Sequence, residues 1–382
     1  MAIYSNEIYL NTLRMAAKSD LPWEKLTGKK IFISGATGLF GLFLTDLLMY
    51  KNKEDALNCH VTAVSRNEEK ARKKFNPAYF ETDCFTYLAH DISVPFDTGD
   101  GQKASADIID QDHVGHDGGK MIRGHDYVIH MASTTHPVAY AKRPIDTVTS
   151  NVFGTKNLLD YCSAHDGCRF VLLSSVEVYG ENRGDVELFD EKYCGYLDSN
   201  TLRAGYPESK RLCETLCQAY ISEKGVDAVI PRLPRSFGPT LDPEDSKALS
   251  QFIKKAVKGE DIVLKSEGNQ HYSYLYAPDA VLGILRVMLL GECGQVYNLA
   301  DESCDMTLKQ LAGICAAQCG REVVFDLPDA TERAGYSTAT KARLDGTRAR
   351  KELGFKPLYL IEDGLKDTIM IMRSESLNPM NQ

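Results

Sequence analysis

Apolar residues recur along the first two thirds of the chain in two alternating patterns. Short runs rich in Val, Ile, Leu and Phe predict buried strands, and between most of these runs the apolar residues fall three or four positions apart, as on one face of an amphipathic helix. The strand-like runs are 30–34, 60–65, 84–88, 126–131, 169–174 and 226–231. The helix-like segments are 39–50, 67–74, 141–164 and 206–224.

Two of the strand-like runs, YVIHMA at 127–132 and RFVLLS at 169–174, are apolar nearly throughout. A strand of that kind is covered on both faces, and strands that alternate with helices build parallel sheets. The pattern therefore predicts an α/β fold, a Rossmann-like doubly wound parallel sheet with helices on both sides.

The alternation becomes irregular from about residue 232 onward. Helices are expected there near 247–258, 278–291, 307–318 and 346–353. We therefore expect a larger domain over residues 1–231, with an amphipathic N-terminal extension, and a smaller C-terminal domain over 232–382 that is partly interleaved with the sheet.

Neither the histidines nor the cysteines form a recognisable metal site. Residues 93–124, rich in Gly and Asp, are expected to form a long surface loop, and His113 and His116 lie within it without a further ligand cluster nearby. The 11 cysteines lie mostly inside apolar periodic segments, as Cys213 and Cys217 do on one helix face. They are expected to be buried, reduced thiols.

The charge pattern argues against several kinds of partner. The net charge is -9, and the 44 Lys and Arg residues are scattered without a basic tract, which argues against a nucleic-acid or anionic-membrane surface. No apolar stretch approaches the roughly 18 residues of a membrane-spanning helix, and the N-terminal segment is too polar for a signal peptide. We therefore expect a cytoplasmic protein.

The stretch KKIFISGATGLFGLFL, residues 29–44, places Gly35, Gly38 and Gly41 between a strand-like run and a helix-like one. A helix N-terminus offers free N–H groups and a partial positive charge to a phosphate, provided that no side chain blocks the approach. The first glycine permits the tight turn, the second lets a pyrophosphate approach, and the third lets the helix pack on the strand. Because strand, turn and helix occur in the required order, we predict a dinucleotide site.

The end of the second strand, VTAVSRN, indicates which dinucleotide binds. NAD sites usually offer an acidic residue there to the ribose hydroxyls, whereas this chain offers Ser65, Arg66 and Asn67. A guanidinium at that place can pair with the 2′-phosphate of NADP, and no carboxylate stands there to repel it. The sequence thus favours NADP over NAD, with Arg66 as the discriminating residue.

Tyr206 and Lys210 stand four apart at the start of a predicted helix, so their side chains lie on one face. Pro207 suits a first helical turn and places the start of the helix near Tyr206. A phenol has an ordinary pKa of about 10, and a neighbouring ammonium favours the phenolate, which moves Tyr206 toward use as a general base. Ser175, at the end of an earlier strand, is predicted to hydrogen-bond the same substrate oxygen.

Together these motifs resemble the extended short-chain dehydrogenase/reductase family, in its nucleotide-sugar epimerase and dehydratase branch. The resemblance covers nearly the whole chain and is carried by the glycine turn, by VLLSSVEVYG and GYPESKRLCETLCQAY, and by further segments. These are HDI at 90–92, HMAS at 130–133, SNVFGTKNLLDYC at 150–162, PRLPRSFGP at 231–239 and LDGTRARKELGFKP at 344–357.

The resemblance implies a mechanism, a partner and a set of cofactor contacts. Tyr206 removes a hydroxyl proton while hydride passes to the nicotinamide, and Lys210 also holds the nicotinamide ribose. The nucleotide-sugar substrate binds against the smaller domain. The family commonly dimerises through the helices that correspond to 141–164 and 206–224, so a homodimer is expected. Besides the residues already named, the implied cofactor contacts are Thr37, Leu39, Asp91, Ile92, Ala132 and Ser133.

The reaction branch depends on what stands beside the redox residues. Oxidation at sugar C4 yields a ketone that acidifies the neighbouring C–H, so epimerisation, dehydration and decarboxylation all become accessible. Glu177 occupies the place of the acid-base glutamate of dehydratases and decarboxylases, but Val176 stands where dTDP-glucose dehydratases carry an aspartate. We expect a 4-epimerase with internal cofactor recycling. The alternatives are a dehydratase or decarboxylase that uses Glu177, and an NADPH-dependent carbonyl reductase.

Two substitutions depart from the family at the expected diphosphate site. The family commonly has asparagine where Arg235 stands and arginine where Tyr272 stands, and in decarboxylases that arginine assists the chemistry. Both residues are predicted to contact the substrate, with Arg235 supplying the cation that Tyr272 does not.

Overall fold

The computed structural model describes residues 2–95, 124–135, 142–327 and 341–376. Its centre is a sheet with the strand order β11-β7-β5-β4-β1-β2-β3, to which the short β6 is added by pairing with β7. Every pairing within this sheet is parallel. The strands are β1 (Lys30–Ser34), β2 (His60–Ser65), β3 (Phe85–Ala89), β4 (Tyr127–His130), β5 (Arg169–Leu172), β6 (Ser174–Ser175), β7 (Asp227–Leu233) and β11 (Val296–Asn298).

This sheet confirms the predicted Rossmann-like fold. All of the predicted strands are present, as β1 to β5 and β7, with their ends shifted by a residue or two. The hydrophobic pattern missed β6 and β11, because runs of two or three residues are too short to show a period. The strand order reverses between β1 and β4, which is where doubly wound sheets bind their ligands.

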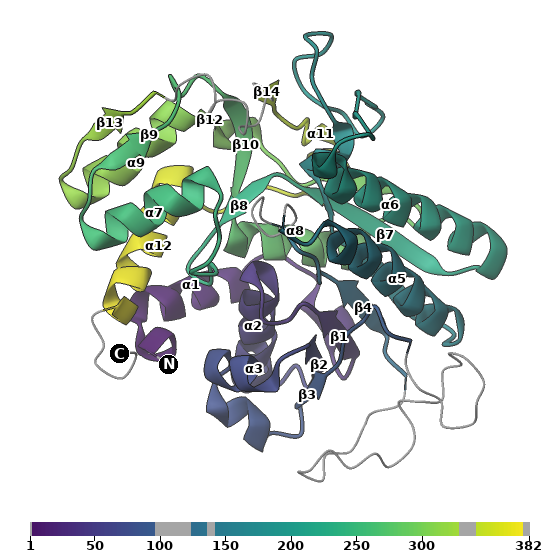
Figure 1. The fold of residues 1–382 in the computed structure, drawn as a ribbon. Coiled ribbons are helices and arrows are strands. Elements are labelled where there is room, and N and C mark those ends of the chain that lie inside the picture. The colour runs from purple at the N-terminus through teal and green to yellow at the C-terminus, as the bar shows by residue number, and fades with distance from the viewer. Residues whose placement is uncertain (1, 96–123, 136–141, 328–340, 377–382) are drawn as a thin grey trace.

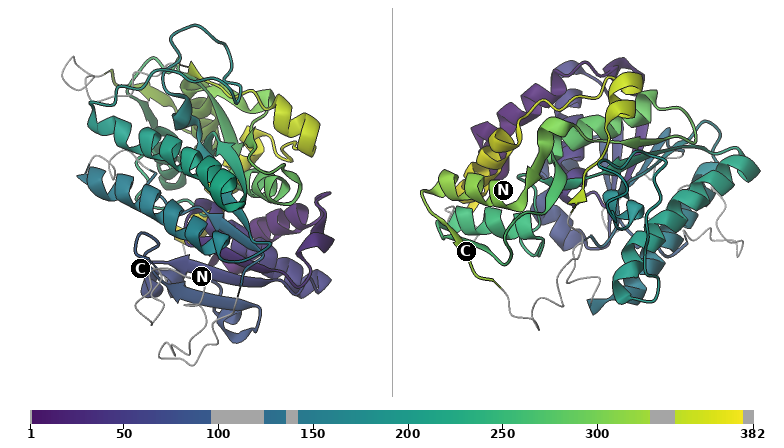
Figure 2. Two further views of the ribbon diagram at one scale, coloured as in Figure 1. Left: turned by 90° about the vertical axis from the view of Figure 1, so that its right-hand side faces the viewer. Right: turned by 90° about the horizontal axis from the view of Figure 1, so that it is seen from above.

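Helices cover both faces of the sheet (Figure 1). They are α1 (Glu7–Ala17), α2 (Leu39–Asp55), α3 (Glu68–Lys74), α5 (Pro144–Ser163), α6 (Gly205–Lys224) and α8 (Ala277–Leu290). Side chains of β1 alternate between the faces, because Ile31 and Ile33 join the core containing α1, α2 and α8, whereas Phe32 joins the core beneath α5 and α6. The helices α5 and α6 pack side by side (Figure 2).

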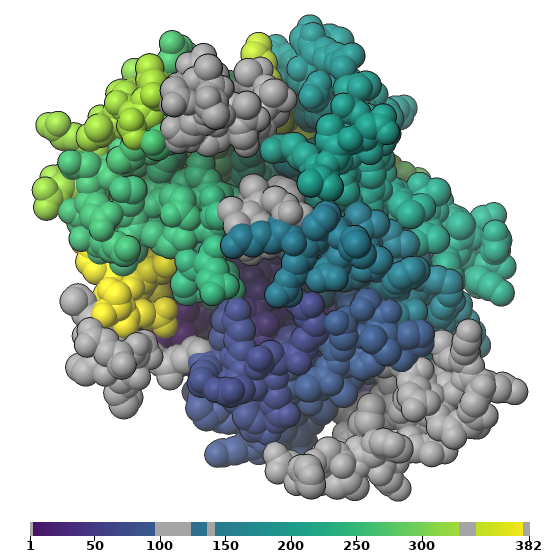
Figure 3. Space-filling view, in the orientation of Figure 1, coloured from purple at the N-terminus to yellow at the C-terminus, as the bar shows by residue number. Residues whose placement is uncertain are grey.

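A smaller lobe is built from the second half of the chain and, coloured green to yellow, lies above the purple and blue N-terminal part in Figure 3. Its strands are β8 (Arg235–Phe237), β9 (Ile262–Leu264), β10 (His271–Tyr276), β12 (Asp305–Thr307), β13 (Val323–Phe325) and β14 (Lys341–Ala342). Its helices are α7 (Ala248–Lys258), α9 (Leu308–Cys319), α11 (Thr347–Leu353) and α12 (Ile361–Ser376). The first three helices confirm predicted ones, whereas the pattern did not predict α12.

Two elements of the second half belong to the larger layer. The strand β11 pairs with β7, and α8 packs on α2, although both follow residue 232. The two expected parts of the chain are therefore interleaved through β11 and α8, and the domain boundary itself stays a prediction.

Among the residues that the structure describes, no helix is both long enough and apolar enough to cross a bilayer. The same described residues contain no group of three or more His, Cys, Asp and Glu side chains that could bind a metal ion. All 11 cysteines are free and seven of them, including Cys213 and Cys217, are buried as expected, but Cys194 and Cys293 are exposed, which contradicts the expectation for these two. His113 and His116 lie outside the described residues.

The N-terminal extension is anchored on a fully buried carboxyl group, that of Asp46 on α2. The hydroxyl of Tyr9 on α1 donates to it at 2.5 Å. The hydroxyls of Tyr4 and Tyr79 donate to its other oxygen at 3.1 and 3.0 Å. Burial raises the pKa of Asp46 to about 7, although the three hydroxyls act to lower it.

We predict that Asp46 makes the stability of the fold depend on pH. Between the ordinary aspartate pKa of about 4 and the folded value of about 7, the folded protein holds a proton that the unfolded chain has released. The contribution of Asp46 to the free energy of unfolding therefore falls as the pH rises through this window, by up to about 1.4 kcal/mol per pH unit.

Denaturant unfolding of the wild type and of Asp46→Asn across this window checks the prediction. The variant carries no titrating group at this position, so it should lose less stability than the wild type as the pH rises. Parallel curves for the two proteins would contradict the assignment.

Candidate active site

The turn between β1 and α2 brings backbone segments closer than side chains would allow. Gly35 has a φ of 71°, and a Cβ there would lie 2.7 Å from the amide nitrogen of Ala132, which follows β4. At Gly41 a Cβ would lie 2.4 Å from the carbonyl oxygen of Gly35. Glycine is therefore required at both positions.

The first turn of α2 fits the phosphates of a dinucleotide. Gly38 is the N-cap residue and no side chain caps the helix, so the amides of the first turn stay available to a ligand. A Cβ at Gly38 would meet one atom within 4 Å, the carbonyl oxygen of Gly35 at 3.2 Å, so the turn faces open space. A phosphate needs this combination of free amides and room.

The two predicted contacts beside Gly38 are held by neighbouring elements. The carbonyl oxygen of Thr37 accepts from the ammonium of Lys74 on α3 at 2.9 Å. The carbonyl oxygen of Leu39 accepts from the hydroxyl of Thr240, which follows β8, at 2.6 Å. The phosphate turn is thus fastened to α3 on one side and to the smaller lobe on the other.

Ser65, Arg66 and Asn67 follow one another where β2 ends and α3 begins. The side chain of Asn67 accepts from a backbone amide of α3 at 2.8 Å, so this predicted cofactor contact caps a helix. Partial burial acts to raise the pKa of Asp91, but hydrogen bonds from Ser93 and the charge of Arg66 lower it overall. Arg66 and Asp91 therefore lie near each other at the same edge of the sheet.

Two further predicted cofactor contacts are Ala132 and Ile92. Ala132 lies against Gly35, as the distances above show. Ile92 packs on Gly154 of α5, where a Cβ would come within 2.6 Å of its side chain. Its carbonyl oxygen accepts from the amide group of Asn157 at 2.8 Å.

A chain of hydrogen bonds joins the predicted cofactor side of the crevice to α6. The hydroxyl of Ser133 donates to Asn151 of α5 at 2.7 Å, and the amide nitrogen of Asn151 donates to Ser209 at 2.9 Å. The hydroxyl of Ser209 donates to the carbonyl oxygen of Tyr206 at 2.8 Å. Sequence reasoning missed Asn151, since its partners lie far away along the chain.

Tyr206 and Lys210 lie in the first turns of α6, and both are buried. The ammonium of Lys210 donates to the carbonyl oxygen of Leu173 at 2.8 Å, between β5 and β6. Burial lowers the pKa of Lys210. Burial and the charge of Lys210 also lower the pKa of His130 to about 3, which leaves that imidazole neutral.

Ser175 and Glu177 lie on elements that pack on the same helix. Ser175 ends β6, and Glu177 lies in the 3-10 helix η5 (Val176–Tyr179) that follows. Both β6 and η5 contact α6, which carries Tyr206 and Lys210. The hydroxyl of Ser175 accepts from the backbone amide of Glu177 at 3.3 Å, so it also caps η5.

Arg235 and Tyr272 belong to the smaller lobe, and their side chains lie in contact with each other beside Glu177. The guanidinium of Arg235 stacks on the ring of Tyr272, 3.6 Å from its centroid, and lies 3.9 Å from the carboxylate of Glu177. Its Nη1 is buried and has no hydrogen-bond partner among the described residues. Burial raises the pKa of Tyr272, and the charge of Arg235 opposes that shift. The side chains of Arg235 and Tyr272, the two predicted substrate contacts, therefore lie side by side.

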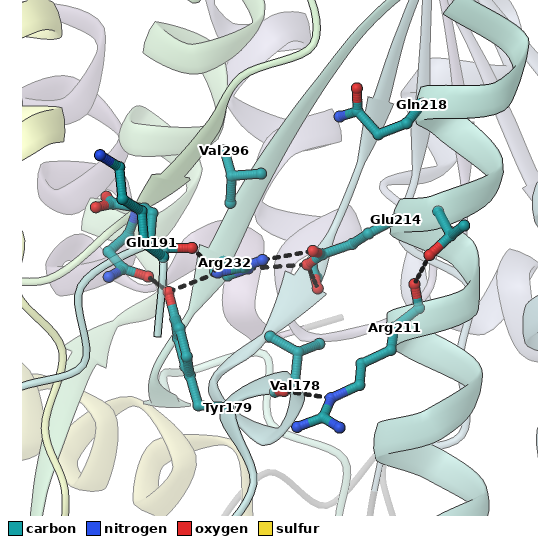
Figure 4. A network of polar contacts seen from close by, with 12 residues as sticks. Val178, Tyr179, Glu191, Arg211, Glu214, Gln218, Arg232 and Val296 are labelled. Carbon is teal, nitrogen blue, oxygen red and sulfur yellow. Dashed lines mark hydrogen bonds and ion pairs between the residues drawn. The ribbon is translucent and has the colours of Figure 1, made fainter. Parts of the chain in front are cut away.

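Figure 4 shows a buried ion pair between Arg232 and Glu214. Arg232 on β7 donates to both carboxylate oxygens of Glu214 on α6, at 2.9 and 2.6 Å. Its remaining nitrogen donates to the hydroxyl of Tyr179 at 2.8 Å. Sequence reasoning did not identify this pair, although an arginine within the apolar run DAVIPRLP was a visible signal.

Comparison with known proteins identifies the family. Residues 31–300 match the NAD dependent epimerase/dehydratase family. The chain belongs to this family. The resemblance inferred from the motifs is thereby confirmed, and the protein is an enzyme of a group that works with a nicotinamide dinucleotide.

Family members with similar sequences are decarboxylases. The chain is 29% identical over 352 residues to UDP-glucuronic acid decarboxylase 1 of Xenopus tropicalis, covering 91% of this chain and 73% of the relative. It is 26% identical over 336 residues to UDP-glucuronic acid decarboxylase 5 of Arabidopsis thaliana, covering 88% of this chain and 87% of the relative.

Solved structures of family members share the fold. UDP-glucose 4-epimerase of Thermotoga maritima superposes with a TM-score of 0.72 at 20% identity, covering 91% of this chain and 99% of that one. The dTDP-glucose 4,6-dehydratase DesIV of Streptomyces venezuelae gives 0.71 at 23% identity, covering 90% and 97%. At these identities the comparison supports the fold alone.

We predict that Tyr206→Phe keeps the fold but lowers turnover by about 100-fold to 10,000-fold, the usual loss when a general base is removed. Steady-state kinetics with the nucleotide-sugar substrate check the turnover, and unfolding midpoints measured in parallel check that the fold is kept. Tyr220→Phe is the matched control, because Tyr220 lies on the same helix and its hydroxyl donates to Asp160 of α5. Turnover near the wild-type value in Tyr206→Phe would refute the assignment.

Proposed function

We propose that this family member is a decarboxylase that oxidises C4 of a nucleotide-linked hexuronic acid, UDP-glucuronic acid being the leading candidate, and releases C6 as CO2. The observation that carries the proposal is the position of Glu177, the acid that the reaction needs, on the 3-10 helix η5 packed on the helix α6 that carries Tyr206 and Lys210. The guanidinium of Arg235, stacked on the Tyr272 ring, lies 3.9 Å from its carboxylate. The decarboxylase relatives favour the same reaction over the 4-epimerase that we expected from the sequence.

The redox step is assigned to residues of β6 and α6. When bound, a nicotinamide dinucleotide would supply the acceptor for the C4 hydride and would give the hydride back, so no cofactor would be consumed overall. Tyr206 takes the proton of the C4 hydroxyl, and the ammonium of Lys210 favours the phenolate that this requires. Ser175 donates a hydrogen bond to the C4 oxygen.

The C4 ketone then activates the neighbouring carboxylate. The C5–C6 bond breaks, CO2 leaves, and the electron pair moves onto the C4 oxygen, where the hydroxyls of Ser175 and Tyr206 stabilise the enolate. C5 next takes up a proton, and Glu177 is the acid assigned to deliver it. Return of the hydride to C4, with the proton held by Tyr206 returning to the C4 oxygen, completes the nucleotide-linked pentose, and Glu177 regains from solvent the proton that it gave to C5.

Arg235 is assigned to the substrate diphosphate. Its Nη1 is buried without a partner among the described residues, and a bound anion would supply one. A diphosphate withdrawn from water needs a charged partner, because leaving it unpaired costs several kcal/mol, which the hydroxyl of Tyr272 alone does not offset.

Mass spectrometry of reactions with a panel of nucleotide sugars tests the proposal. Decarboxylation predicts that UDP-glucuronic acid loses CO2 without net change in nicotinamide absorbance. Loss of water would indicate a dehydratase, and an unchanged mass with an inverted C4 would indicate the 4-epimerase. Steady consumption of reduced cofactor would indicate a carbonyl reductase, and any of these three results would overturn the decarboxylase assignment.

Arg235→Ala should raise the dissociation constant of a nucleoside diphosphate by one to several decades, as when one member of a buried charge pair is removed. Adding Tyr272→Arg should restore much of the affinity, because the two side chains stack on each other and the new guanidinium would occupy nearly the same place. Calorimetric titration of both variants measures this. An unchanged affinity in Arg235→Ala would point to a substrate without a diphosphate.

We also propose that Arg66 selects NADP through its 2′-phosphate. Arg66→Ala should weaken NADP binding by roughly 1 to 3 kcal/mol and leave NAD binding nearly unchanged, since a charge-assisted contact is lost only for the phosphorylated cofactor. Arg72→Ala is the control, because Arg72 lies nearby on α3 and pairs with Glu68. Equal losses for both cofactors, or a wild type that prefers NAD, would count against the proposal.

We further propose a homodimer formed through α5 and α6. Apolar side chains stand exposed on this layer: Ile145 is 76% and Phe153 is 51% exposed on α5, and Leu212 is 46% exposed on α6. Phe153→Glu should shift sedimentation from dimer to monomer, whereas Phe325→Glu, at an exposed site on β13, should not. A monomeric wild type would end this proposal.

A further inference from the structure

The ion pair of Arg232 and Glu214 is almost completely withdrawn from water. The side chains retain 11% and 13% of their exposure, and the guanidinium meets the carboxylate through two hydrogen bonds. A buried pair of this kind is weak evidence for a role in stability alone, because well-packed apolar residues often stabilise a fold equally well. The positions of its contacts indicate what else the pair does.

Two features connect Glu214 with residues assigned to the redox step. Glu214 stands one helical turn after Lys210 on α6, so the two side chains share a face. Its carboxylate also accepts from the hydroxyl of Ser174, the residue before Ser175. One carboxylate thus joins the strand end that carries Ser175 to the helix that carries Lys210.

Arg232 extends the connection toward Glu177. Its Nη1 donates to the hydroxyl of Tyr179, two residues beyond Glu177, and to the backbone carbonyl of Glu191 at 2.9 Å. Figure 4 shows Arg232 between Tyr179 on one side and Glu214 on the other. The hydroxyl of Tyr179 in turn donates to Asn298 at 2.7 Å, so β11 also contributes a hydrogen bond to this network.

The pair also sets the charge around Lys210. Burial acts to lower the pKa of Lys210, and the nearby negative charge of Glu214 opposes that shift. The other titratable groups facing Lys210 are Cys213 and Cys217, whose pKa values burial raises, and His130, which is neutral. Glu214 is therefore the one carboxyl group, among the described residues, whose charge acts on Lys210, and it is paired with Arg232.

We propose that Arg232 and Glu214 are positioning residues for the redox site: together they hold the Ser175 strand end on α6, and Arg232 balances the charge that Glu214 places beside Lys210 and Tyr206. This inference rests on the proposed roles of Tyr206 and Lys210. A pair that served stability alone would hold the same atoms together but would leave the titration of Tyr206 independent of which partner is removed.

Removing one partner at a time should move that titration in opposite directions. Arg232→Gln leaves Glu214 uncompensated, and a negative charge disfavours the phenolate, so the pKa of Tyr206 and the acidic limb of the pH–rate profile should rise. Glu214→Gln leaves Arg232 uncompensated, and both should fall. Shifts of less than about one pH unit are expected, because eight residues of α6 separate Glu214 from Tyr206, and the double variant should return close to the wild type.

The titration of Tyr206 can be measured directly by NMR as well as through the pH dependence of activity. Carbon-13 in the tyrosine ring carbon that bears the hydroxyl reports the phenolate by NMR without substrate, and Tyr206→Phe identifies the resonance by its loss. Where a single variant does not fold, Arg232→Lys and the double variant remain. Arg232→Lys keeps the charge but not the two-pronged contact, so it should preserve the titration and lower the turnover number.

The outcomes separate the two proposals. Opposite shifts in the two single variants support the positioning role. Shifts of the same sign, or none, in folded variants overturn it, and so does a displaced titration in Arg232→Lys. If Tyr206→Phe keeps wild-type turnover, the redox assignment fails first, whatever the titrations of the ion-pair variants show.

Discussion

The candidate site depends on how closely the backbone after β1 lies against the backbone after β4. A Cβ at Gly35 would come within 2.7 Å of the Ala132 amide, so only glycine permits this contact where the strand order reverses. The hydroxyl of Ser34 fastens the same edge, since it pairs with His130 at 2.8 Å and accepts from the amide of Met131. One contact between the ends of two strands therefore fixes the positions of both the glycine turn before α2 and the segment that follows β4.

From that edge, polar contacts lead to the proposed redox residues by two routes. One passes through Asn151, which connects Ser133 to the first turn of α6. The other passes through Arg232 and Glu214, which connect the sheet to α6 and to the strand end before Ser175. Each route orients side chains through atoms whose own positions are held by packing, which is what a site needs to stay preorganised.

The smaller lobe contributes the features that distinguish this member from its family. Arg235 of β8 and Tyr272 of β10 occupy positions where the family commonly has asparagine and arginine. They meet because the two strands pair, with Arg235 opposite Tyr274. In this chain the cation of the two positions lies on β8, beside Glu177. This exchange preserves charge in the pocket although neither position matches the family, which is why the diphosphate assignment survives as a proposal.

Much of this protein could be predicted from residues that lie close together in the sequence. The glycine spacing, the strand and helix periods and the four-residue step from Tyr206 to Lys210 are all written within short stretches, so the fold class and the candidate site residues could be inferred from them. The elements β6, β11 and α12 and the six strands of the smaller lobe were missed, because all of these strands except β10 have only two or three residues, and β10 and α12 lie in a region of irregular pattern. The tertiary structure alone decided which distant polar groups meet: Asp46 with three tyrosines, Asn151 with Ser133, and Arg232 with Glu214. Such pairs carry no local signature, because a buried charge is recognisable only once the fold has shown which partner neutralises it.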